Sequence, residues 1–230
     1  MCDHSISRRG LLAGLAVGVS ALLLPRLPGA NEQAPPMSAE QAYQLLREGN
    51  ARFLAGKTER PNLTAQRIGE TASKGQHPFA TIISCSDSRV PVEHLFDRGI
   101  GDLFVVRVAG NVIDIDEAGT TEYGASHLMT PLVVVMGHTQ CGAVSAVVKG
   151  VQVKGNIPKL VEHIIPAVER AKAKGTTGDA LVLDAIKENV HQSIQTLLAS
   201  SQELYQLRES GRMKIIGALY HIENGKVEWL

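Results

Sequence analysis

The 230-residue chain lacks an excess of charge of either sign: 23 basic and 23 acidic residues give a formal net charge of zero at pH 7. Nothing in this balance suggests a polyanion or an acidic membrane surface as a partner, so nucleic-acid binding is not expected. Internal repeats and low-complexity tracts are also missing. The length is short for two full domains, and a single domain with a sizeable core is therefore the expected organisation.

A long apolar run is missing as well. The stretch Gly10–Leu24 has 15 residues, whereas a helix that spans a bilayer needs about 20, so no stable membrane anchor is expected. The stretch follows Arg8 and Arg9 and is succeeded by small residues ending at Ala30, which is the layout of an export signal. The arginine pair resembles a twin-arginine signal. We expect residues 1–30 to be an export signal peptide and the protein to be exported, to the periplasm.

The segment that follows is polar and contains two prolines. Residues 31–37, NEQAPPM, are interpreted as a linker, and a single domain is expected to fill residues 38–230. Ser38 and Gln41 have the spacing of a capping box, and apolar residues recur behind them at helical intervals, which predicts an amphipathic helix over 39–55. The apolar face of this helix needs a partner, either the body of the domain or another subunit.

Four short apolar runs rich in branched residues predict strands that are covered on both faces. The predicted strands are 79–84, 103–110, 132–137 and 214–220, and the helical stretches between and around them are 117–129, 141–149, 157–174 and 181–209. This order predicts an α/β fold with a mostly parallel sheet flanked by helices, preceded by the N-terminal helical arm. Asn224-Gly225 is a hairpin signal, so an antiparallel edge is expected at the C-terminus.

Cysteine is scarce, and its placement is informative. One of the three cysteines, Cys2, lies in the predicted signal, which leaves Cys85 and Cys141. A disulfide or two buried structural thiols would account for a pair of cysteines, but their neighbours favour a metal site. Cys85 follows the first predicted strand, and His138 and Cys141, in GHTQCG, follow the third. Side chains at these ends of parallel strands meet at one edge of a sheet, and a Cys2His set is one that zinc uses, with a fourth position for water or another protein group.

An acidic and a basic residue follow the first of these cysteines in CSDSRVP. Asp87 lies within reach of a metal held by Cys85, and Arg89 is placed to hold Asp87 by a bidentate pair. Two roles for Asp87 stay open: a fourth metal ligand, or an acceptor of a hydrogen bond from metal-bound water. A cysteine phosphatase loop is disfavoured, because three residues between cysteine and arginine are too few to wrap a phosphate and one of them is acidic.

The motifs CSDSRVP and GHTQCGA, with GDLFVVRVAGN between them and LREGNARFLAGK before them, resemble the β-class carbonic anhydrases. The resemblance covers essentially the whole chain from Ser38 onward. It implies zinc-dependent, reversible hydration of carbon dioxide to bicarbonate and a proton by zinc-bound hydroxide, with one Zn2+ per subunit. The zinc ligands that it implies are Cys85, His138 and Cys141, and the pair beside the metal is Asp87 and Arg89.

The resemblance extends to the plant-type branch through GQHPFATIISCSDSRV and TEYGASHL, which implies that Gln76 and Tyr123 bind substrate. It also implies a homodimer or a multiple of dimers. Two alternatives use the same scaffold: hydrolysis of a carbon dioxide analogue, carbonyl sulfide or carbon disulfide, and a non-catalytic, zinc-stabilised regulatory subunit. The pair Asp87 and Arg89 favours an enzyme over the regulatory subunit, because a purely structural zinc site has no need of such a pair.

Overall fold

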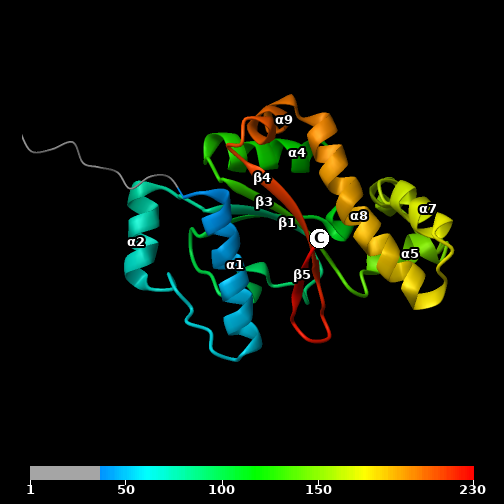
Figure 1. The fold of residues 1–230 in the computed structure, drawn as a ribbon, viewed down its shortest axis with the longest axis horizontal. Coiled ribbons are helices and arrows are strands. Elements are labelled where there is room, and N and C mark those ends of the chain that lie inside the picture. Colours follow the sequence, from blue (N-terminus) through cyan, green and yellow to red (C-terminus); the bar gives the residue numbers. More distant parts are fainter. Residues whose placement is uncertain (1–36) are drawn as a thin grey trace, which may run out of the picture. The chain divides into compact units, whose positions relative to one another are not determined.

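The computed structural model describes residues 37–230, so the predicted signal peptide and all but the last residue of the predicted linker lie outside the described residues. The described chain is built around a five-stranded sheet of order β2-β1-β3-β4-β5 (Figure 1). Neighbouring strands are parallel except β5, which runs antiparallel to β4. The strands are β1 Ala80–Ser84, β2 Leu103–Arg107, β3 Leu132–His138, β4 Lys214–Tyr220 and β5 Val227–Trp229. The predicted fold class, including the antiparallel C-terminal edge, is confirmed.

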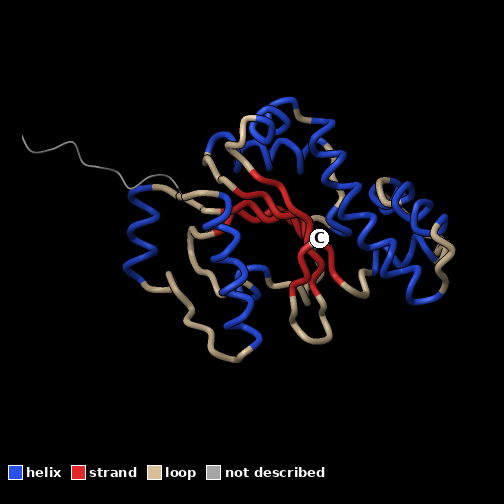
Figure 2. Tube along the Cα trace, viewed as in Figure 1, coloured by secondary structure: helices blue, strands red, loops and turns tan. Residues whose placement is uncertain are grey.

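Helices lie on both faces of this sheet (Figure 2). The helices that precede β3 are α1 Ala39–Leu54, α2 Ala65–Lys74, α3 Val92–Leu95 and α4 Ile115–Glu122, with a 3-10 turn at Ala109–Asn111 and a π-helical turn, η2, at Tyr123–His127. Those that follow β3 are α5 Gly142–Val148, α6 Ile157–Glu162, α7 Ile165–Ala173, α8 Gly178–Ser200 and α9 Gln202–Glu209. None of these helices is long and apolar enough to cross a membrane.

Alternate residues of each central strand enter different cores. Ile82 packs in one cluster with Leu46 of α1 and Phe96 after α3, whereas the next residue, Ile83, packs in a second cluster with Val190 of α8. Every residue of β1 and β3 is buried. The sequences of β1 and β3 do not alternate between apolar and polar residues, because both faces of the sheet are covered.

Helix α1 finds its partner in its own subunit. The predicted capping box is present, with Gln41 N–H donating to Ser38 Oγ and Ser38 N–H donating to Gln41 Oε1. Leu46 is fully buried in the core. Asn50 donates to main-chain oxygens at two distant points of the chain and accepts from Val227 N–H. The apolar face of α1 thus packs on the body of its own domain and does not need a second subunit to cover it.

Three predicted elements have boundaries that differ in the structure. The predicted strand 103–110 ends at Arg107, because the chain turns at Gly110 with a φ of +73°. The predicted helix 157–174 is two helices, and Pro166 lies in the first turn of the second one, where the hydrogen bond that proline cannot donate is not required. The predicted helix 181–209 is interrupted at Ser201, which is extended and caps α9 through its hydroxyl.

Candidate metal centre

Three sulfur- and nitrogen-bearing side chains converge at the carboxyl edge of the sheet. Cys85 directly follows β1, His138 ends β3, and Cys141 precedes the first residue of α5. All three residues are buried, with at most 5% of their surface exposed. One ligand atom from each lies within 4.8 Å of the others. The structure thus brings together the three residues that the sequence predicts as metal ligands, since the parallel strands β1 and β3 are neighbours.

The ring of His138 is oriented for metal binding. Its Nδ1 lies 2.9 Å from the main-chain oxygen of Thr139, which only accepts hydrogen bonds, so Nδ1 carries the proton and Nε2 has a free lone pair. Nε2 is buried and has no hydrogen-bond partner among the described residues. Burying a nitrogen lone pair without a partner costs free energy. A metal ion at the point where the three ligand atoms converge would give this lone pair a partner.

The two thiols cannot both ionise easily without a cation. The hydrogen bond from Cys141 lowers the pKa of Cys85, against the opposing effect of burial, and His138 and the N–H of Gly110 lower it further. The interaction with Cys85 and burial raise the pKa of Cys141. Since a divalent cation neutralises two thiolates, it removes this conflict. Two thiolates and one imidazole are ligands that suit zinc.

Asp87 and Arg89 form a bidentate pair beside this group. Arg89 donates from Nε to Asp87 Oδ1 over 2.9 Å and from Nη2 to Oδ2 over 2.7 Å, and its main-chain N–H also donates to Oδ1. These bonds hold the pKa of Asp87 far below its usual range, so the carboxylate is ionised. Asp87 Oδ2 lies 3.8 Å from His138 Nε2, but Asp87 does not belong to the converging group of three.

Two further residues that sequence reasoning did not single out as site residues shape the loop. Arg107, at the end of β2, donates from Nε to the main-chain oxygen of Cys85 and from Nη2 to that of Asp87, over 3.1 and 2.7 Å. Gly110 donates its N–H to Cys85 Sγ over 3.2 Å, and its own oxygen is held by Asn189 of α8. The one available signal was the position of GDLFVVRVAGN at the end of a neighbouring strand.

Gln76 and Tyr123 lie elsewhere in the subunit. Gln76 is exposed and precedes β1, whereas Cys85 follows this strand at its other end. The ring of Tyr123 lies 5.8 Å from that of Phe104, and Phe104 pairs with Thr81, four residues and thus about 13 Å of strand from Cys85. One subunit does not bring either side chain to the metal centre, and their substrate-binding role stays a prediction.

Several known proteins that resemble this chain in sequence or fold are named as carbonic anhydrases. A family model described as carbonic anhydrase matches residues 80–227. Carbonic anhydrase 2 of Mycobacterium tuberculosis is 36% identical over 197 residues, which cover 84% of this chain and 93% of that protein. The β-carbonic anhydrase CafA of Aspergillus fumigatus superposes with a TM-score of 0.65 and 27% identity, over 82% of this chain and 90% of that one. Two tetrameric β-carbonic anhydrases from Sordaria macrospora share the fold, with a TM-score of 0.66 and 22% identity over 83% of this chain and 97% of theirs.

A buried Cys2His group at the carboxyl ends of parallel strands, with an ionised carboxylate beside it, is typical of the metal site of an enzyme. The sequence relatives identify the enzyme family. The chain belongs to the carbonic anhydrase family, in its β-class.

Proposed function

We propose that this chain catalyses the reversible hydration of carbon dioxide to bicarbonate and a proton, with one zinc ion per subunit. The observation that carries the proposal is the convergence of Cys85, His138 and Cys141 within 4.8 Å, with no hydrogen-bond partner for His138 Nε2 in residues 37–230. Zinc held by these residues would supply an acidified water molecule as the nucleophile. The family relationship supports carbon dioxide as the substrate.

Asp87 acts in this proposal on the nucleophile rather than on the metal. Both of its oxygens are held by Arg89, and binding the metal would require the carboxylate to give up part of that pair. An ionised carboxylate fixed at this place accepts a hydrogen bond and orients the donor toward the carbon atom of the substrate. Arg89 does not need to touch the substrate, and we assign it as the positioning residue of Asp87.

Gln76 and Tyr123 are remote from the metal ligands of their own subunit. We propose that they bind substrate at the metal centre of a second subunit. Strand β2 is at an edge of the sheet, and Phe104 of this strand contacts Tyr123, which is half exposed. Ile115 and Met129, which flank the segment that carries Tyr123, are exposed by 76% and 71%. An open strand edge with exposed apolar side chains beside it suits a homodimer interface.

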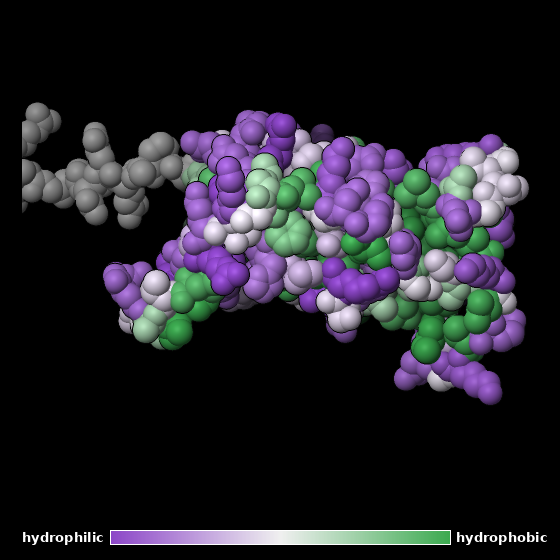
Figure 3. Space-filling view, turned by 90° about the horizontal axis from the view of Figure 1, so that it is seen from below, coloured by the Kyte–Doolittle hydropathy of each residue, from purple (hydrophilic) through white to green (hydrophobic). Residues whose placement is uncertain are grey.

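A second apolar surface supports assembly into multiples of dimers. Apolar side chains gather on the helical end of the molecule formed by α5–α7 (Figure 3), where Val151, Ile157 and Ile165 are about half exposed. Such surfaces are typical of interfaces between proteins. Sedimentation of the purified protein should show a dimer or larger species, and a monomer at micromolar concentration would contradict the assembly.

We also propose that the protein is exported through its twin-arginine-like signal. This proposal rests on the sequence of residues 1–30 alone. Replacement of Arg8 and Arg9 by lysine should keep the protein in the cytoplasm. Undiminished arrival of the double variant in the periplasm would assign export to a different route.

The decisive experiment is stopped-flow measurement of carbon dioxide hydration by protein of measured zinc content. We expect rapid hydration by the parent protein and a loss of about 100-fold or more in Asp87→Ala, the size of effect expected for a proton-accepting group. Carbonyl sulfide and carbon disulfide are tested beside it. Turnover of a sulfur compound without hydration would favour the hydrolase alternative, and zinc binding without either activity would favour the regulatory subunit.

A further inference from the structure

We propose that Glu223 is a positioning residue for the metal centre. It holds Thr139, which lies between two of the three ligands in the chain, and through Thr139 it fixes the ring of His138. The inference rests on the proposed zinc site and adds to it a residue of the C-terminal hairpin, far from the ligands in sequence.

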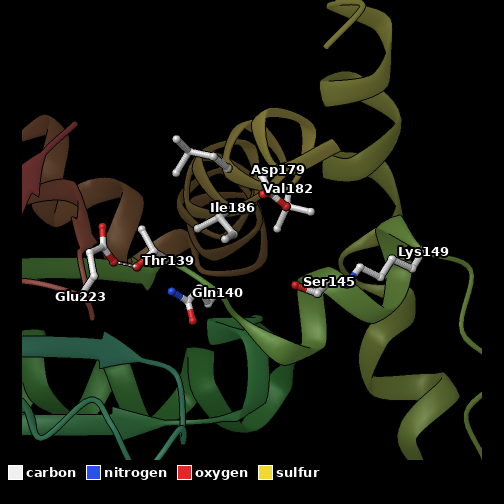
Figure 4. Close-up of a pocket in the computed structure, with 9 residues that line it drawn as sticks. Thr139, Gln140, Ser145, Lys149, Asp179, Val182, Ile186 and Glu223 are labelled. Carbon is white, nitrogen blue, oxygen red and sulfur yellow. Dashed lines mark hydrogen bonds between the residues drawn. The ribbon is translucent and has the colours of Figure 1, made fainter. Parts of the chain in front are cut away.

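The hydroxyl of Thr139 is bound on two sides by this hairpin. It donates to Glu223 Oε2 over 2.7 Å (Figure 4) and accepts from the N–H of Ile222 over 3.0 Å. The N–H of Thr139 also donates to the main-chain oxygen of Tyr220, over 2.9 Å. Three hydrogen bonds therefore hold Thr139, in the loop between His138 and Cys141 that we call the ligand loop, against the end of β4 and the turn beyond it.

The ligand loop needs this fastening because of its own geometry. Gln140, between Thr139 and Cys141, has a φ of +57°, a left-handed conformation that residues other than glycine seldom adopt and that costs free energy. The main-chain oxygen of Thr139 is the acceptor for Nδ1 of His138. A shift of Thr139 therefore turns the His138 ring and moves Nε2 relative to the two thiols.

Glu223 is itself held in place, although about half of its side chain is exposed. Its Oε1 lies 3.2 Å from Nδ1 of His221, and Nε2 of the same ring lies 3.1 Å from Oε2 of Glu228. Glu228 in turn pairs with Lys187 of α8 over 2.8 Å. Both oxygens of Glu223 are therefore held, and this chain of contacts anchors Glu223 to the body of the domain.

The contact between Glu223 and Thr139 borders a cavity of about 390 Å³. Figure 4 shows Glu223 and Gln140 at this cavity, which is also lined by residues of α5 and α8. Water from the cavity has access to the hydroxyl of Thr139 when the carboxylate is removed. Replacing Glu223 thus leaves no buried polar group unsatisfied, so the variant is expected to fold and to lose only the fixed position of the loop.

The test is zinc retention by three variants of the full-length, zinc-loaded protein. Outer partners of metal ligands typically change metal affinity by 10–100-fold, so we expect zinc transfer to a chelator to be about tenfold faster in Glu223→Ala and in Thr139→Val. Glu223→Gln keeps an acceptor oxygen and should lie between these variants and the parent. The absorption bands of the cobalt-substituted protein, which report ligand geometry, should shift in the first two variants.

The double variant and a control separate positioning from stability. If Glu223 acts through Thr139, the double variant releases zinc no faster than Thr139→Val, because that substitution already removes the bond to Glu223. The control is Glu188→Ala, which breaks pairs with Arg170 and Lys174 but does not contact the ligand loop; its zinc release should equal that of the parent even if its melting temperature falls.

Parent-like zinc release and unshifted cobalt bands in Glu223→Ala overturn the inference, and this variant decides even if Thr139→Val does not fold. Equal acceleration in Glu188→Ala also overturns it, because general destabilisation then accounts for the effect. A parent protein that binds no zinc overturns the proposed function as well, which makes the two failures distinguishable.

Discussion

Arg89, after β1, donates from Nη2 to the main-chain oxygen of Gln140, after β3, over 3.3 Å. The bond joins the loop that carries Cys85 to the loop that carries the other two ligands. The same guanidinium holds both oxygens of Asp87. The orientation of the carboxylate and the spacing of the two ligand loops therefore depend on one side chain.

Replacing Arg89 by lysine tests this dependence. A lysine ammonium cannot make two parallel bonds to a carboxylate and a third to a carbonyl, so kcat/KM for hydration should fall about 10–100-fold while zinc content stays near one per subunit, because no ligand is lost. Arg208→Lys is the control, since Arg208 also donates from Nε and Nη2 to a neighbouring carboxylate, to one oxygen of Glu209 on the surface. Full activity in Arg89→Lys would remove Arg89 from the positioning role.

Replacing a thiol ligand tests the metal centre itself. In Cys141→Ser the hydroxyl does not ionise near neutral pH, so the cation loses one of its two anionic ligands. We expect zinc measured by elemental analysis to fall well below one per subunit and hydration to fall with it. His163→Ala is the control, since His163 is partly exposed and pairs with Asp114, not with the metal group. Unchanged zinc content in Cys141→Ser would show that the ion binds elsewhere.

Acid stability should depend on Asp97, a buried carboxylate that accepts from Arg52 Nε and from the N–H groups of Glu59 and Arg60 over 2.7–3.0 Å. Burial by itself raises the pKa of Asp97, but these donors outweigh it and the pKa is lowered. The unfolded carboxyl titrates near pH 4. Asp97 therefore stabilises the fold above this pH, and the contribution is lost as the pH falls through the lower, folded pKa.

Asp97→Asn keeps the shape and removes the charge. Urea unfolding at pH 7 should show a loss of roughly 2–3 kcal/mol, as for hydrogen bonds to a charged group, and the difference from the parent should shrink in buffers below about pH 4. The exposed Asp116 provides the control, Asp116→Asn. A deficit in Asp97→Asn that is independent of pH would contradict the assignment.

Two glycines distinguish close packing from helix propensity. A Cβ at Gly49 would overlap the main-chain oxygen of Phe96, whereas a Cβ at Gly69 would meet nothing within 4 Å. Gly49→Ala should therefore push α1 away from the end of α3 and lower the free energy of unfolding by about 1–3 kcal/mol. Gly69→Ala should raise it by up to about 1 kcal/mol, because alanine favours the helix. Similar midpoints for both variants in urea would refute the packing argument.

The sequence by itself determined the parts of the protein that depend on local pattern. Buried strands, helices on both faces and the Asn224-Gly225 turn follow from residue order and from the preferences of the backbone. The three metal ligands could also be predicted from the sequence, because the carboxyl ends of parallel strands meet at one edge of a sheet. Helix α2 was missed, and none of its residues is buried; the strand ending at Arg107 was drawn too long, because a turn with positive φ is a matter of a single residue.

Only the tertiary structure decided what depends on distant segments. It packed α1 against its own sheet through Asn50, kept Asp87 outside the group of three ligands, and joined the two ligand loops through the bond from Arg89 to Gln140. It also placed Glu223 against Thr139, 84 residues away in the chain. Such contacts are made by side chains whose separation in sequence carries no periodic signal, because they form only when the whole sheet has brought its edges together.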